Sequence, residues 1–88
     1  GDGGAYPVAE LRMSSYKNNR LCYIPEHVIV RNVEKVLNDR PADNDSGADA
    51  YFRERISWAL GILAGYAEAL KPMRETVQIH HDKFGNGM

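Results

Sequence analysis

Residues 56–67 read ISWALGILAGYA, and no charged side chain interrupts the stretch between Arg55 and Glu68. The stretch is too short to cross a bilayer, since a membrane-spanning helix needs about 20 apolar residues. It is also too apolar to be exposed to water on every side. We therefore expect it to be buried, either in the core of this chain or against another chain.

The spacing of the apolar residues around this stretch predicts a long helix with two apolar stripes. The helix is expected from about Ala48 to Leu70 or Lys71, because the ring of Pro72 clashes with a continuing helix. The first stripe has the alternating spacing of helices packed at a shallow angle, and it consists of Ile56, Leu60, Leu63, Ala67 and Leu70. The second stripe, widened by Trp58, consists of Ala59, Ile62, Tyr66, Ala69 and Met73.

A glycine pair, Gly61 and Gly65, lies on the same predicted helix. Each glycine costs roughly 1 kcal/mol of helix stability relative to alanine, and a neighbouring backbone can approach closely along small residues. One stripe is enough for packing within a small domain, so the second stripe needs another partner. We therefore predict a homodimer interface on this helix. The expected interface residues are Ile56, Leu60, Gly61, Leu63, Gly65, Ala67 and Leu70. The alternative is a monomer in which this helix is the central core helix.

The N-terminal half predicts a β-hairpin. From Val8 to Tyr16 apolar and polar residues alternate, which is the pattern of a half-buried strand. Asn18-Asn19 suits a tight turn, and Arg20 to Ile24 is the expected returning strand. Residues 1–7 are expected to be a flexible arm, and residues 85–88 a frayed tail.

A helix is predicted to follow the hairpin, from Pro25 to about Asn38. Proline suits the first helical turn, and Glu26 complements the helix dipole. The spacing of Ile29 and Val33 favours the helix, whereas the β-branched run 28–30 favours a strand, so both interpretations stay open.

The remaining segments are predicted as a loop and a short helix. Residues 40–47, RPADNDSG, have the composition of a loop, and Ser46 or Asp49 can cap the long helix after it. A shorter helix from Met73 to about Lys83 is expected after Pro72. The predicted fold is therefore a single α+β domain over residues 8–84, with an N-terminal hairpin packed on two or three helices and one long central apolar helix.

The composition sets broad limits on function. A chain of 88 residues forms one small domain, and its 43% hydrophobic and 26% charged residues are typical of a globular protein. A net charge of −1 removes the simplest argument for nucleic-acid binding, which is a basic surface. Cys22 is the single cysteine, so no internal disulfide forms, and we expect it to be a small buried apolar residue. The compartment stays unknown: a cytoplasmic location is the simpler expectation, and a removed signal peptide would leave the same sequence.

Two groups of polar residues invite a metal-site interpretation, and neither fits well. Asp43, Asp45, Asp49 and Glu54 have the spacing of an EF-hand calcium loop. However, Ala48 occupies the position where the turn needs glycine, so a solvated loop with a helix cap is the better interpretation. His80-His81-Asp82 contains an H-x-D spacing, but iron sites of that kind need a third ligand on a large β-scaffold. We therefore predict no metal, no cofactor and no catalytic residue.

Residues 20–62 resemble a ribbon-helix-helix DNA-binding unit. The resemblance is carried by the expected strand RLCYI, by Pro25-Glu26 opening a helix, and by YFRERISWALGIL as a second helix. In that family, paired strands of a dimer enter the major groove. Here the residues that alternate with Cys22 and Ile24 are Asn19, Leu21 and Tyr23, which suit base contacts poorly, and the loop between the helices is long.

The sequence therefore leads to one main functional hypothesis and one alternative. The main hypothesis is a non-enzymatic small regulatory or adaptor protein that acts through protein–protein contacts, as a homodimer through the helix near residues 49–71. The alternative is a dimeric DNA-binding transcriptional regulator or antitoxin of the ribbon-helix-helix type. The protein partner stays unidentified, and no membrane span is expected.

Overall fold

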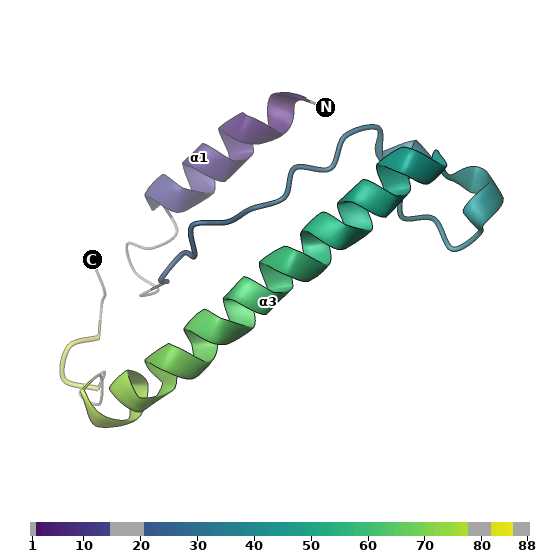
Figure 1. Ribbon diagram of the computed structural model, residues 1–88. Helices are drawn as coiled ribbons and strands as arrows, with labels where there is room; N and C mark the ends of the chain where they lie inside the picture. The colour runs from purple at the N-terminus through teal and green to yellow at the C-terminus, as the bar shows by residue number, and fades with distance from the viewer. Residues whose placement is uncertain (1, 15–20, 78–81, 86–88) are drawn as a thin grey trace.

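A computed structural model describes residues 2–14, 21–77 and 82–85 of the chain. Its two α-helices are α1, Ala5–Ser14, and α3, Ser46–Thr76. Three short 3-10 helices accompany them: η1 Asp2–Gly4, η2 Val33–Lys35 and η3 Pro41–Asp43. Residues 21–31, which we call the extended segment, run between α1 and α3 in the direction opposite to both helices (Figure 1).

The predicted α+β fold with an N-terminal hairpin is wrong, because the described residues contain no strand. The alternating residues before Ser14 form α1 instead. Alanine, leucine, glutamate, arginine and methionine are all good helix formers, and Gly4, Val8 and Arg12, four residues apart, are the half-buried residues of this region. The expected turn at Asn18-Asn19 lies outside the described residues.

The helix predicted from Pro25 to Asn38 is also wrong. Residues 26–31 are extended, and within residues 25–38 the only helical turn is η2. The β-branched run at 28–30 explains the difference, since these side chains lose rotamer freedom in a helix. The first helix that the ribbon-helix-helix resemblance implies is therefore not formed.

The long helix is present, with different ends from those predicted. It begins one residue after Asp45, whose side chain accepts a hydrogen bond of 3.0 Å from the backbone N–H of Ala48. Neither of the expected caps, Ser46 and Asp49, has this role. The helix also continues through Pro72 to Thr76, so no separate helix begins at Met73. Proline removes one backbone hydrogen bond near the end of the helix, where few helical turns remain to be disrupted.

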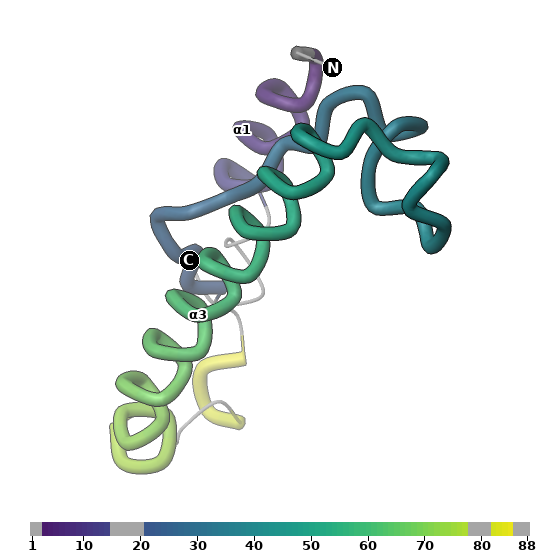
Figure 2. The backbone as a smooth tube through the Cα atoms, turned by 45° about the vertical axis from the view of Figure 1, so that its right-hand side comes forward, coloured from purple at the N-terminus to yellow at the C-terminus, as the bar shows by residue number. Residues whose placement is uncertain are grey.

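The two helices pack on opposite sides of the extended segment (Figures 1 and 2). Toward α1, the Tyr23 hydroxyl donates to the Leu11 carbonyl at 3.1 Å, and Arg12 donates to the Ile24 carbonyl at 3.0 Å. Gly4 also approaches this side so closely that an added Cβ would lie 2.6 Å from Cγ2 of Ile29. The molecule is accordingly elongated, with principal extents of 54 × 26 × 19 Å.

Candidate functional site: the apolar surface of α3

Many of the large apolar side chains of α3 are exposed to solvent. Among the described residues only Val36 is fully buried, at 1% exposure. We define the α3 surface as the exposed residues in the middle of the helix: Trp58, Leu60, Gly61, Leu63, Gly65, Tyr66 and Ala67. Large exposed apolar patches typically mark interaction sites on soluble proteins.

The structure divides the predicted interface residues between two sides of the helix. Ile56 and Leu70 are half-buried, whereas Leu60 and Leu63 are 57% and 47% exposed. Gly61 and Gly65 are exposed, and a Cβ added at either glycine would have nothing within 4 Å beyond its own helix. Because neighbouring helical residues are separated by about 100°, Gly61 lies nearly opposite Leu63. The seven residues therefore do not form one face: Leu60 and Ala67 share the side of Leu63, and the two glycines lie on the other side.

The extended segment covers the side of α3 that contains Leu63. It leaves an open apolar groove of about 240 Å³ beside the C-terminal half of the helix. The groove is lined by Leu21, Cys22 and Ile24 from the extended segment and by Leu63, Tyr66, Ala67, Leu70, Met73 and Arg74 from α3. Cys22 is exposed here, so the expectation that it would be buried is wrong.

Arg55 holds the extended segment against α3. Its Nη2 donates to Glu26 Oε2 at 2.7 Å and to the backbone carbonyl of His27 at 3.2 Å. The guanidinium also lies over the ring of Trp58, with Cζ 4.7 Å from the ring centroid. The sequence does not predict this ion pair, because a separation of 29 residues leaves no periodic signal.

Asp49 holds the loop before α3 against the first turns of that helix. Its Oδ1 accepts the backbone N–H of Leu37 at 2.6 Å, and its Oδ2 accepts from Arg53 Nε at 2.8 Å. The Leu37 hydrogen bond, followed by the hydrogen bond and the positive charge of Arg53, holds the pKa of Asp49 below its usual 3.8. The backbone of Leu37 has a left-handed conformation, with φ of 61°, so this hydrogen bond also fixes an uncommon turn.

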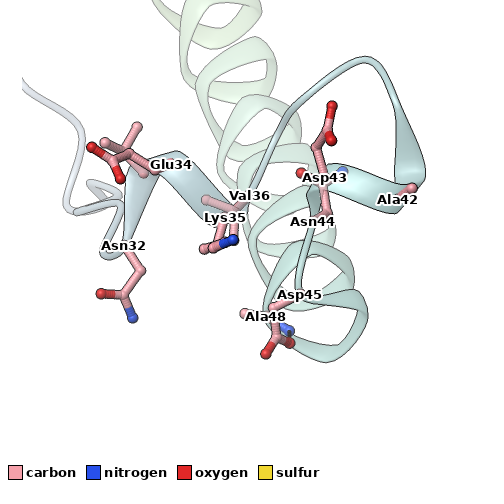
Figure 3. A pocket seen from close by; sticks show the side chains of 10 residues that line it. Asn32, Glu34, Lys35, Val36, Ala42, Asp43, Asn44, Asp45 and Ala48 are labelled. Carbon is pink, nitrogen blue, oxygen red and sulfur yellow. Dashed lines mark hydrogen bonds between the residues drawn. The ribbon is translucent and has the colours of Figure 1, made fainter.

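The same loop forms a polar hollow of about 700 Å³ (Figure 3). Asn38 and Asn44 close the loop, since the Asn38 backbone N–H donates to Asn44 Oδ1 at 3.0 Å and Asn44 Nδ2 donates to the Asn38 carbonyl at 3.2 Å. The charges that line the hollow have both signs: Glu34, Asp43 and Asp45 beside Lys35. Among these, the Asp45 carboxylate is already used as the cap of α3. The hydrogen bonds of this region therefore fix the loop and the start of α3.

The residues of the calcium-loop interpretation are dispersed by these contacts. Oδ2 of Asp43 lies 3.7 Å from Nε of Arg40, and Asp45 caps α3. Asp49 accepts hydrogen bonds from the Leu37 backbone and the Arg53 side chain. Within the described ranges, no group of three or more histidine, cysteine or acidic side chains is placed to hold a metal ion. Of the H-x-D residues, His80 and His81 lie outside the described residues.

Comparison with known proteins gives no family for this chain. No protein-family model, curated protein or solved structure matches it. The described helices also include none with the length and apolar character needed to cross a membrane. The function is therefore inferred from the geometry of the α3 surface.

Proposed function

We propose that the protein is a non-enzymatic regulatory or adaptor module that acts through protein–protein contacts, as a homodimer through α3. The observation that carries this proposal is the excess of exposed surface. The chain exposes 7075 Å², whereas a folded monomer of 9.9 kDa is expected to expose about 5,200 Å². Its radius of gyration of 17.3 Å likewise exceeds the value of about 12 Å expected for a compact domain of this length.

The size of this excess agrees with what a stable dimer buries. The difference is about 1,900 Å² per chain, and stable interfaces bury from about 800 Å² per partner in standard complexes to twice that or more in obligate dimers. A second copy is the simplest occupant, because a two-fold interface uses the same patch on both subunits. The exposed apolar residues of α3 supply such a patch.

The glycine side of the α3 surface is the best candidate for the centre of that interface. Gly61 and Gly65 face away from the extended segment, and no other part of the described chain lies near them. Trp58, which is 54% exposed, lies one helical turn before Gly61. Exposed tryptophan is enriched among the residues that dominate binding energy, and two glycines allow the backbone of a neighbouring helix to approach closely.

The decisive experiment is a solution mass by light scattering at micromolar concentration. We expect the wild-type chain to have the mass of two copies. Gly61→Leu places a bulky side chain in open space within one copy and raises intrinsic helix propensity. The variant should therefore keep its helical circular dichroism and have the mass of one copy.

A second pair of variants separates loss of the interface from loss of folding. Gly65→Glu introduces a charge on the glycine side of the α3 surface, where an added side chain meets open space within one copy, and Val33→Glu introduces the same charge at an exposed site in η2. Only Gly65→Glu should reduce the mass. A wild-type mass equal to one chain would overturn the proposed homodimer, and a dimeric mass for both Gly61→Leu and Gly65→Glu would move the interface away from the glycine side of α3.

A further inference from the structure

The glycine side of α3 differs between the two halves of the helix. Tyr51 and Trp58 lie in the N-terminal half, and Gly61, Gly65 and Ala69 follow in the C-terminal half. Consecutive members of this set are seven, three, four and four residues apart, so that all five share one side of the helix. All five are exposed. Large aromatic side chains therefore protrude from the first half of this side, and the second half is recessed.

Contacts within the chain hold the two aromatic side chains in place. Trp58 stacks on the Arg55 guanidinium, with 4.7 Å between Cζ and the ring centroid, and Glu26 binds that guanidinium at 2.7 Å. Tyr51 meets Phe52 edge to face, with 5.4 Å between the ring centroids. Even so, Tyr51 and Trp58 are 61% and 54% exposed, and they flank a hollow of about 260 Å³. Aromatic side chains that are already ordered lose little conformational entropy when a partner covers them.

The second half of this side leaves the helix backbone open. A Cβ added at Gly61 or Gly65 would meet nothing within 4 Å beyond its own helix, and Ala69 contributes a single methyl group. Small residues of this kind let a neighbouring helix and its side chains approach the backbone closely. This half of α3 can therefore receive large side chains such as those of the first half.

A two-fold interface needs a surface that is complementary to itself, because both subunits use the same patch. A side of α3 with only large residues, or with only small ones, would not meet this condition. Here one side supplies both in sequence, first the two aromatic residues and then the small ones. A second copy is therefore the partner that this side of α3 fits.

We propose that the homodimer is antiparallel, with the aromatic half of each α3 packed on the glycine half of the other. This inference rests on the proposed homodimer and specifies how its subunits are arranged. In a parallel two-fold pair each residue faces its own copy, so that Trp58 would meet Trp58 and the glycines would leave a gap, which forfeits packing contacts. In an antiparallel pair, Trp58 faces Gly65 of the partner subunit when the helices cross between residues 61 and 62.

The distance between the same position in the two copies measures this orientation. Glu75 is exposed near the end of α3, and Glu75→Cys combined with Cys22→Ser gives one site for a nitroxide spin label. With a rise of about 1.5 Å per residue, the antiparallel arrangement separates the two labels by about 40 Å, whereas a parallel pair holds them within about 20 Å. Pulsed electron paramagnetic resonance of the labelled dimer measures the distance, and light scattering of the same sample gives its mass.

An exchange of the two facing residues tests the packing itself. Gly65→Trp should reduce the mass to one copy, because each Trp58 then meets a second tryptophan. Adding Trp58→Gly should restore the dimer, since every contact again joins one tryptophan and one glycine. Circular dichroism of both variants checks that α3 is retained.

The outcomes separate the orientation from the homodimer. A dimeric mass with a label distance below about 20 Å, or a helical double variant that stays monomeric, overturns the antiparallel arrangement alone. A wild-type mass of one copy overturns the homodimer as well.

Discussion

Arg55 and Glu26 are separated by 29 residues, yet Arg55 Nη2 donates to Glu26 Oε2 at 2.7 Å and so joins the middle of α3 to the extended segment. Both side chains are about three-quarters buried, with exposures of 26% and 24%. Breaking an ion pair by removing one partner is costly when the remaining charge stays shielded from water. The extended segment therefore depends on this pair for its position.

Glu26→Ala should reduce the free energy of unfolding by about 1–3 kcal/mol, because it leaves the Arg55 charge without its carboxylate. Urea denaturation followed by circular dichroism measures the change. Glu34→Ala is the control, since the Glu34 side chain is exposed and forms no ion pair within the described residues. Equal effects of the two substitutions would show that the ion pair does not contribute to stability.

Gly4→Val should loosen the contact between α1 and the extended segment. The new Cβ would meet Cγ2 of Ile29 at 2.6 Å, and β-branched isoleucine has little freedom to rotate away. We expect a loss of about 1–3 kcal/mol, typical of overpacking, and faster proteolysis within α1. Gly3→Val is a matched control, because a Cβ there has nothing within 4 Å. If the two variants are equally stable, Gly4 is not a packing requirement.

Acid should release the loop that Asp49 fixes. The folded-state pKa of Asp49 lies below its usual 3.8, chiefly because the carboxylate accepts the Leu37 N–H. Its contribution to stability is therefore present above the unfolded pKa and is lost as the pH falls through the folded pKa. Unfolding temperatures between pH 7 and pH 3 should decrease less steeply for Asp49→Asn than for wild type. Parallel pH profiles for the two proteins would contradict this role.

Pro72→Ala should stabilise the C-terminal turns of α3. It restores a backbone N–H that can donate within the helix and removes the clash of the proline ring, effects worth up to about 3 kcal/mol in a helix interior. The gain is expected to be smaller here, since Pro72 lies close to the last helical residue, Thr76. Amide hydrogen exchange of residues 68–77 provides the measurement. Slower exchange in the variant is expected, and unchanged exchange would show that the proline costs the helix nothing.

The existence of α3 could be predicted from the sequence, because its apolar spacing repeats over many turns. The ends of α3 could not be predicted, since Asp45 caps the helix in place of the expected residues and the helix continues through Pro72. The hairpin prediction is wrong for a different reason. Leu11 and Met13 fit the alternation of a strand, but they are also good helix formers, and a pattern of nine residues does not separate the two.

The predicted interface residues depend on helical spacing alone, which does not show what covers each side of the helix. Ile56, Leu63 and Leu70 are seven residues apart and share a side of α3, and this side is partly occupied by the extended segment. The contribution of that segment could not be predicted, because its position depends on contacts between distant residues such as Arg55 and Glu26. The remaining exposed residues include the glycine pair, which keeps the homodimer prediction open.

Because the extended segment lies between the two helices, its contacts set the order in which the molecule unfolds. α1 contacts this segment through Arg12 and Tyr23, and the preceding η1 contacts it at Ile29, whereas the segment itself is bound to α3. The first helix can detach and leave the inner contacts intact, but release of the segment also frees that helix. α3 thus supports the whole molecule, whereas loss of α1 and η1 exposes only the sides of Tyr23 and Ile29 that they contact.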